Sequence, residues 1–294
     1  MTNLFPSKII LFGEYSLVAG GSGLAVPYTH YSGELSFEAG PNSAISNQSI
    51  QQLFDYLRTR IAPNIINLLQ LERDLENGLW FDSNIPNGYG LGSSGALIAA
   101  LYHRYQLEKA TDLSTLKSHL ASMESFFHGS SSGVDPLVAL LQKPVILKQN
   151  QVTELCDWSL EKLGFSLYLV DTGLKSKTIS LVDWFKFSML KERFNEATKH
   201  DYMLPNEAII TNIQQGLPID FHHIMEISRY QLEYLSPMVT DTFRKHFFAG
   251  LENTNFAFKL CGSGGGGFML CFARDKKMAE TYFKENQLRF EPLI

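Results

Sequence analysis

The stretch PNGYGLGSSGALIAALYHRY, residues 86–105, constrains the fold of this chain more than any other. Glycine occupies every second position from Gly88 to Gly92, and two serines and an apolar helical run follow. Glycine lets the backbone approach a ligand closely and adopt left-handed conformations. The first amides of a helix have no intrahelical acceptor and lie at the positive end of its dipole. The string therefore predicts an anion site at a helix start, with Ser93 and Ser94 at the cap position.

A capped helix after a flexible loop is the plain alternative for this string. It is not a P-loop, because the GxxxxGK[ST] spacing and its lysine are absent. A second glycine-rich loop, GSGGGG at residues 262–267, separates two apolar stretches. Four consecutive glycines offer little to pack and lower stability through backbone entropy. We therefore expect this loop to approach a ligand, with a floppy hairpin tip as the alternative.

Composition narrows the class of protein. The 294 residues are 45% hydrophobic and 19% charged, enough to bury a sizeable core. The formal net charge of -5 argues against nucleic acid as a partner, and no apolar stretch is long enough for a membrane span. The three cysteines form no CxxC pair and favour a reduced, cytoplasmic setting. The apolar run IILF is broken by Gly13 and Glu14, so no signal peptide is expected.

Hydrophobic periodicity places strands and helices in both halves of the chain. Strands are expected over residues 8–12, 20–28, 33–40, 78–86 and 164–173, around the glycine loop in 256–273, and in a hairpin at 144–155. Helices are expected over residues 49–62, 95–106, 113–129 and 276–287, and the chain between residues 173 and 256 is expected to be mostly helical. In the first of these helices one face carries Ile50, Leu53, Phe54 and Leu57. A fresh apolar strand after a polar segment sets a boundary near residue 160, which gives two α+β domains, 1–160 and 161–294.

Three motifs resemble the signatures of the GHMP kinases, in the family's order and at its usual separations. SKIILFGEYSLVAGG resembles the first signature, PNGYGLGSSGAL the second and KLCGSGGGGF the third. The resemblance covers essentially the whole chain. It implies an α+β, two-lobed fold, with an ATP-binding N-terminal lobe like ribosomal protein S5 domain 2 and a ferredoxin-like C-terminal lobe. It also implies transfer of the γ-phosphoryl group of Mg-ATP to a hydroxyl of a small carboxylate metabolite.

ESFFHGSSSGVDPLVA, residues 124–139, resembles the HGxPSGxD pattern of the mevalonate kinase branch. That branch proposes the aspartate as catalytic base and a glutamate eleven residues earlier as a magnesium ligand, which here are Asp135 and Glu124. Its catalytic lysine stands six residues before the first-motif glutamate, as Lys8 does before Glu14. Without the motif, Glu124 is typical of a solvated helix face, Asp135 of a turn, and Lys8 of a surface charge.

The resemblance distributes the remaining roles. Mg²⁺ is expected on Ser94 and Glu124, and Lys8 is expected to keep the Asp135 carboxylate ionised as proton acceptor. The ATP phosphates are expected on Gly88, Gly90, Leu91, Gly92, Ser93, Ser94 and Gly95. Substrate contacts are expected from Glu14, Tyr15, Thr178, Gly264 and Gly265.

Departures from the family pattern leave the phosphoryl acceptor open. Tyr15 replaces a histidine, Ser131 replaces the proline of HGxPSG, and Cys261 replaces a threonine. Tyr15 is either a core aromatic or a substrate contact, and we favour the contact. The strings GEYS and SSGA favour phosphomevalonate kinases, which usually lack HGxxSGxD. Mevalonate, from the isoprenoid precursor pathway, is the expected acceptor; phosphomevalonate kinase and a non-catalytic metabolite-binding protein are the alternatives, and a homodimer is left open.

Overall fold

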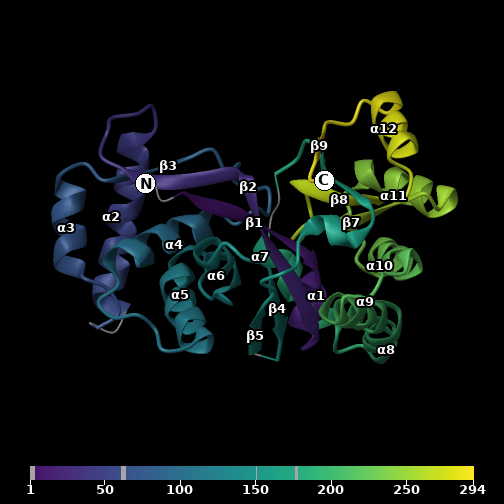
Figure 1. The fold of residues 1–294 in the computed structure, drawn as a ribbon, viewed down its shortest axis with the longest axis horizontal. Helices are drawn as coiled ribbons and strands as arrows, with labels where there is room; N and C mark the ends of the chain where they lie inside the picture. Colours follow the sequence, from purple (N-terminus) through teal and green to yellow (C-terminus); the bar gives the residue numbers. More distant parts are fainter. Residues whose placement is uncertain (1–3, 61–63, 150, 176–177) are drawn as a thin grey trace. The chain divides into compact units, whose positions relative to one another are not determined.

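The computed structural model describes residues 4–60, 64–149, 151–175 and 178–294 (Figure 1). The chain divides into two compact units whose segments interleave. The first unit contains the residues up to Ile9, Val26–Pro86 and Leu91–Lys143; the second contains Ile10–Ala25, Asn87–Gly90 and Pro144–Ile294. The domain boundary near residue 160 stays a prediction, since these units are defined by contacts alone.

The first unit is built around helices that cover a short antiparallel sheet. Its helices are α2 (Ser43–Arg60), α3 (Leu68–Glu76), α4 (Ser93–Tyr105), α5 (Leu113–His128) and α6 (Val134–Leu141). Strand β3 (Trp80–Ser83) pairs with Gly33–Ser36 of β2 (Ser22–Ser36), and β1 (Phe5–Phe12) also pairs with β2. The predicted apolar face of α2 is confirmed, because its four residues are the buried ones of that helix. Helix α4 packs against both α5 and α6, which places its N-terminus beside that of α6.

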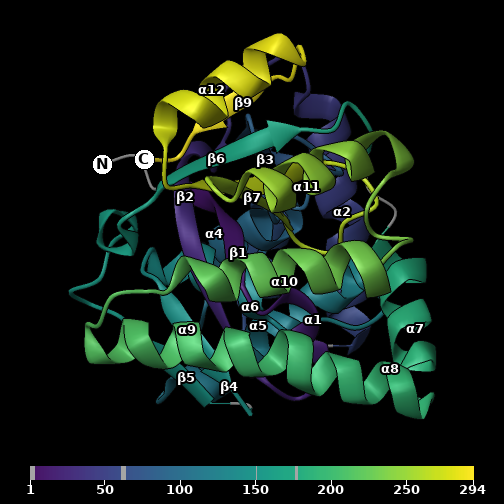
Figure 2. The ribbon, with the colours of Figure 1, turned by 90° about the vertical axis from the view of Figure 1, so that its right-hand side faces the viewer.

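The second unit contains a four-stranded antiparallel sheet in the order β7-β8-β6-β9. These strands are β7 (Phe256–Leu260), β8 (Phe268–Ala273), β6 (Ser166–Asp171) and β9 (Phe290–Pro292). Helices α10 (Phe221–Tyr234) and α11 (Asp241–Asn253) lie against β7, and α9 (Leu204–Gln215) runs beside α10 (Figure 2). The remaining helices are α1 (Glu14–Val18), α7 (Thr178–Ser188), α8 (Glu192–Ala197) and α12 (Lys276–Glu285).

The α+β class is confirmed, and every strand pairing whose register is described is antiparallel. The hairpin β4 (Val145–Lys148) and β5 (Gln151–Glu154) is also confirmed. The two strands expected over 20–28 and 33–40 are one continuous strand, β2. Helices α1, α3 and α6 and strand β9 were not expected; α6 is only eight residues long and follows the loop-like GSSSG sequence. No helix in the described ranges is long and apolar enough to cross a membrane.

Candidate active site

The start of helix α4 is the centre of the candidate site in the first unit. Gly92 caps this helix in the left-handed region, with φ 73°, and the Ala96 amide donates to its carbonyl at 3.0 Å. The expectation that Ser93 and Ser94 take the cap position is therefore wrong: both lie inside the first turn. Their amides, like the next one, precede the first intrahelical bond, so the helix presents donors and a positive dipole end at this point.

Lys8 and Asp135 meet beside this glycine cap. Lys8 Nζ lies 3.1 Å from Asp135 Oδ1, and the two side chains are 5% and 28% exposed. The Lys8 amide donates to the Leu91 carbonyl at 3.0 Å, which fixes the lysine next to the loop. A Cβ on Gly92 would lie 3.0 Å from Asp135 Oδ2, and one on Gly95 would lie 2.6 Å from Asp135 Cβ. Glycine at both positions therefore lets α4 approach the aspartate at the start of α6.

Glu124 lies buried next to the same helix start, on α5. Its residue is only 3% exposed, so the solvated-face alternative is wrong. Ser94 Oγ donates to Glu124 Oε1 at 3.2 Å, and Ser131 Oγ donates to Oε2. Burial and the negative charge of Asp135 raise the pKa of Glu124 to about 7, against the opposing hydrogen bonds and the Lys8 charge. Lys8, Ser94, Glu124 and Asp135 thus come together as one cluster.

Two further side chains complete this cluster and were given no role from the sequence. Ser131 also accepts the Gly133 amide at 2.9 Å, so its hydroxyl links the Glu124 carboxylate to the loop that leads into α6. His128 Nε2 lies 3.2 Å from Ser94 Oγ. The departure from proline at position 131 was the signal that could have revealed the first of them, because a serine there adds a hydroxyl that proline lacks.

The oxygen atoms around Glu124 are suitable ligands for a hard cation. They belong to its carboxylate and to the hydroxyls of Ser94 and Ser131. Within the described residues, no group of three or more His, Cys, Asp and Glu side chains could hold a metal by itself. Mg²⁺ usually takes one or two protein ligands together with phosphate oxygens and waters, so this small set is the kind it uses beside a nucleotide.

The raised pKa of Glu124 predicts a pH-dependent stability in metal-free protein. Between about pH 4.5 and 7 the native carboxyl keeps a proton that the unfolded chain has released. The free energy of unfolding should therefore fall as pH rises through this window, by on the order of 3 kcal/mol, and then level off. Thermal unfolding in EDTA at pH 5, 6, 7 and 8 measures this. As pH rises, the stability of Glu124→Gln relative to the wild type should increase, whereas that of Glu72→Gln, on an exposed face, should not. If the stability of Glu124→Gln and of the wild type changed with pH in parallel, Glu124 would not be the group responsible.

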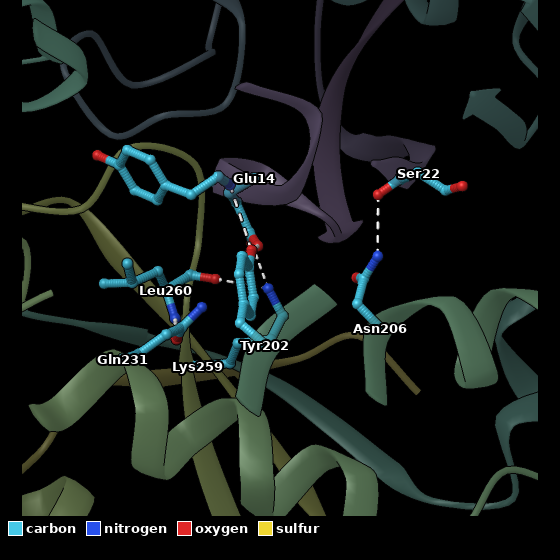
Figure 3. A network of polar contacts seen from close by, with 8 residues as sticks. Glu14, Ser22, Tyr202, Asn206, Gln231, Lys259 and Leu260 are labelled. Carbon is cyan, nitrogen blue, oxygen red and sulfur yellow. Dashed lines mark hydrogen bonds and ion pairs between the residues drawn. The ribbon is translucent and has the colours of Figure 1, made fainter. Parts of the chain in front are cut away.

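The second unit has its own buried polar network, which begins at Glu14 on α1 (Figure 3). Glu14 forms an ion pair with Lys259 of β7, and their side chains are 2% and 0% exposed. The Tyr202 hydroxyl donates to Glu14 Oε2 at 3.4 Å, and Lys259 Nζ donates to the Leu260 carbonyl at 3.0 Å. Glu14 is therefore a buried, internally paired carboxylate, and its role as a substrate contact stays a prediction.

Tyr15, the residue that replaces the family's histidine, lies in the core of the same unit. It is 1% exposed and packs on Phe185, with ring centroids 4.8 Å apart. Its hydroxyl donates to the Ser263 carbonyl at 2.7 Å, and its amide donates to the Tyr202 hydroxyl at 3.2 Å. Burial and the Glu14 charge raise the pKa of the Tyr15 phenol. The hydroxyl is thus a neutral donor directed at the third glycine motif.

Neighbouring segments lie close to the four glycines of that motif, residues 264–267. Each glycine has a positive φ, between 72° and 136°. A Cβ on them would come within 2.6–2.8 Å of, in turn, Met238, Leu181, Lys175 and Tyr89. The expectation that these glycines have little packing value is therefore wrong: side chains are excluded because neighbouring segments occupy the space. Contact of Gly264 and Gly265 with a substrate stays a prediction.

The remaining predicted residues have simpler placements. Gly90 in the second unit leaves room for the Cys261 carbonyl, which would lie 3.0 Å from a Cβ, and Gly88 faces the stem of Lys175. Both have positive φ, so glycine suits their backbone conformation as well. Thr178 begins α7, and its side chain lies outside the described residues.

Residues 55–143 match the family described as GHMP kinases N terminal domain. The fold is similar to that of L. major mevalonate kinase in complex with R-mevalonate (TM-score 0.65, 16% identity, covering 97% of this chain and 90% of that one). It is equally similar to Streptococcus pneumoniae phosphomevalonate kinase in complex with phosphomevalonate and AMPPNP (TM-score 0.64, 14% identity, 98% of each chain). Residues 55–143 thus match a GHMP kinase N-terminal domain, and together with the curated relatives this match indicates a phosphotransferase that acts on an alcohol group.

Among curated proteins, the mevalonate kinase of Pyrococcus abyssi is 27% identical over 308 residues, covering 92% of this chain and 88% of the relative.

Proposed function

We propose that this protein is an ATP-dependent mevalonate kinase. The observation that carries the proposal is the cluster at the start of α4, where Lys8, Asp135 and Glu124 gather beside a glycine-capped helix. A helix start of this kind binds phosphate through its amides and dipole. The similarity to mevalonate kinase of Pyrococcus abyssi over most of both chains supports mevalonate as the acceptor.

In the proposed reaction, the oxygen of the acceptor hydroxyl bonds to the γ-phosphorus while Asp135 accepts the hydroxyl proton. The bond between the γ-phosphorus and the β,γ-bridging oxygen breaks, and ADP leaves. Lys8, 3.1 Å from the carboxylate, holds Asp135 in place as the proton acceptor and can stabilise charge that builds on the γ-phosphoryl group. The amides at the start of α4 hold the phosphates and stabilise their charge. Mg²⁺, which would be held by Ser94 and Glu124, supplies charge neutralisation on the phosphates.

Phosphomevalonate kinase is the second candidate, favoured by the strings GEYS and SSGA. The fold does not choose between the two, because the neighbours of both kinds have nearly equal TM-scores. A non-catalytic binding protein is disfavoured, since such a protein has no need to retain Lys8, Glu124 and Asp135 in contact. A cytoplasmic location and a small-molecule partner, without nucleic acid or membrane, remain part of the proposal.

A coupled ADP-release assay with Mg-ATP tests the acceptor directly. We expect turnover on mevalonate and at most slow turnover on 5-phosphomevalonate, with no ADP release when magnesium is chelated. Faster turnover on 5-phosphomevalonate would assign the second candidate. No turnover on either, with nucleotide still bound, would favour a binding protein.

A further inference from the structure

We propose that Tyr15 is a positioning residue whose hydroxyl holds the third glycine motif, residues 262–267, in its ordered conformation. The inference rests on the proposed function only for what the loop does in the reaction. Its structural part depends on contacts within the second unit. It differs from the expectation that Tyr15 contacts the substrate itself.

The first observation is the direction of the hydroxyl. Tyr15 Oη donates to the Ser263 carbonyl at 2.7 Å, a contact between residues 248 positions apart in the sequence. Tyr15 is 1% exposed, so its hydroxyl lies in the core, and this bond contributes to holding the loop. Phe185, whose ring packs on Tyr15, is itself fully buried, so the ring has one available placement.

The second observation is that the backbone of Tyr15 is itself held by a buried side chain, Tyr202. The Tyr15 amide donates to the Tyr202 hydroxyl, which in turn donates to Glu14 Oε2 (Figure 3). Tyr202 is fully buried and stacks on Tyr230 at 5.1 Å with an interplanar angle of 4°. The position of the phenol is therefore determined by side chains from several elements of the unit.

The third observation is that the same network also holds the chain just before the loop. Lys259 pairs with Glu14 and donates to the Leu260 carbonyl, immediately before the loop begins. The Leu260 amide donates to Gln231 Oε1 at 2.8 Å. Helix α1 thus contacts strand β7, just before the glycine motif, through Glu14 and the motif itself through Tyr15.

The loop needs such support because glycine gives it little conformational preference of its own. Unfolded glycine samples more backbone conformations than other residues, so an ordered run of four loses much entropy. Two loop amides donate to neighbouring segments, Gly265 to the Met238 carbonyl and Gly267 to the Leu174 carbonyl, each at 2.6 Å. The Tyr15 hydroxyl adds a bond at the Ser263 carbonyl, and the Thr172 hydroxyl donates to the Gly267 carbonyl at 2.7 Å, so the loop is held just before its four glycines and at the last of them.

Amide hydrogen exchange on the protein without nucleotide or acceptor tests this proposal. We expect Tyr15→Phe to speed exchange in peptides that cover residues 261–267 by about fivefold, the effect of losing one modest hydrogen bond. Tyr168→Phe is the matched control, since it deletes another buried tyrosine hydroxyl of the same unit, bonded to Glu280 at 3.1 Å. It should leave the loop peptides unchanged. Tyr15→His should behave like Tyr15→Phe.

Steady-state kinetics separate positioning from direct substrate contact. If Tyr15 positions the loop, the loss of kcat/KM in Tyr15→Phe should accompany faster loop exchange in the substrate-free protein. Wild-type exchange in Tyr15→Phe together with a raised KM for the acceptor would overturn the proposal and make Tyr15 a substrate contact. Because exchange is measured without substrates, failure of the proposed function would leave this result intact.

Discussion

Asp135→Asn should reduce kcat by about 10²–10⁴-fold, the range for loss of a general base, while nucleotide binding is retained. The amide keeps the shape of the carboxylate that packs against Gly92 and Gly95, but it cannot accept the hydroxyl proton. Single-turnover measurements with mevalonate give the rate of phosphoryl transfer, and titration with a fluorescent nucleotide gives the nucleotide affinity. A rate near that of the wild type would remove Asp135 as the base.

The control for this substitution is Asp112→Asn, the same chemical change at another helix start of the first unit. Asp112 caps α5 by accepting the Thr115 amide at 2.8 Å, and asparagine caps a helix about as well. Its rate should stay near that of the wild type.

Lys8 provides a second check on the base. Since Lys8 acts through the carboxylate 3.1 Å away, Lys8→Met should cost far less on the Asp135→Asn background than alone. Additive losses would mean that the two side chains act independently.

Lys259→Met should lower the free energy of unfolding by about 3–5 kcal/mol, because it leaves the Glu14 carboxylate buried without its partner. Urea denaturation at pH 7, followed by tryptophan fluorescence, measures the change. The double variant Glu14→Gln with Lys259→Met should recover much of the loss. The neutral amide needs no counter-ion, and its oxygen can still accept from Tyr202.

The surface pair Lys276 and Glu280 on α12 is the matched comparison. Its lysine side chain is 61% exposed and the ammonium lies 3.9 Å from the carboxylate. Lys276→Met should therefore cost at most about 1 kcal/mol. A similarly small loss in Lys259→Met would show that water reaches the inner pair.

The sequence was sufficient to predict the elements with strong periodicity and the cluster marked by motifs. The apolar face of α2, the long helix α4 and the hairpin β4–β5 follow from local patterns of residues. The spacing of Glu124 and Asp135 within one motif led to two side chains that the structure places beside Ser94 and Lys8.

The remaining features depend on contacts between distant residues, which no local pattern encodes. The substrate contact of Glu14 stays a prediction, but its buried pairing with Lys259, 245 positions away, could not be read from the sequence. The glycines of residues 264–267 were interpreted through a ligand, whereas neighbouring segments of the unit fill the space beside them. The cap of α4 was misplaced because Ser93 and Ser94 are good cap residues, yet only glycine fits against Asp135 and Lys8.

The interleaved path of the chain has a consequence for its synthesis. The polypeptide passes from one unit to the other after residues 9, 25, 86, 90 and 143. A ribosome that has translated the first 160 residues has therefore made all of the first unit, but only fragments of the second. Glu14 then stays hydrated until Lys259, 245 positions later in the sequence, leaves the exit tunnel. We expect the second unit to assemble only after Lys259 has emerged, and nascent chains arrested at residue 160 to require chaperones for solubility.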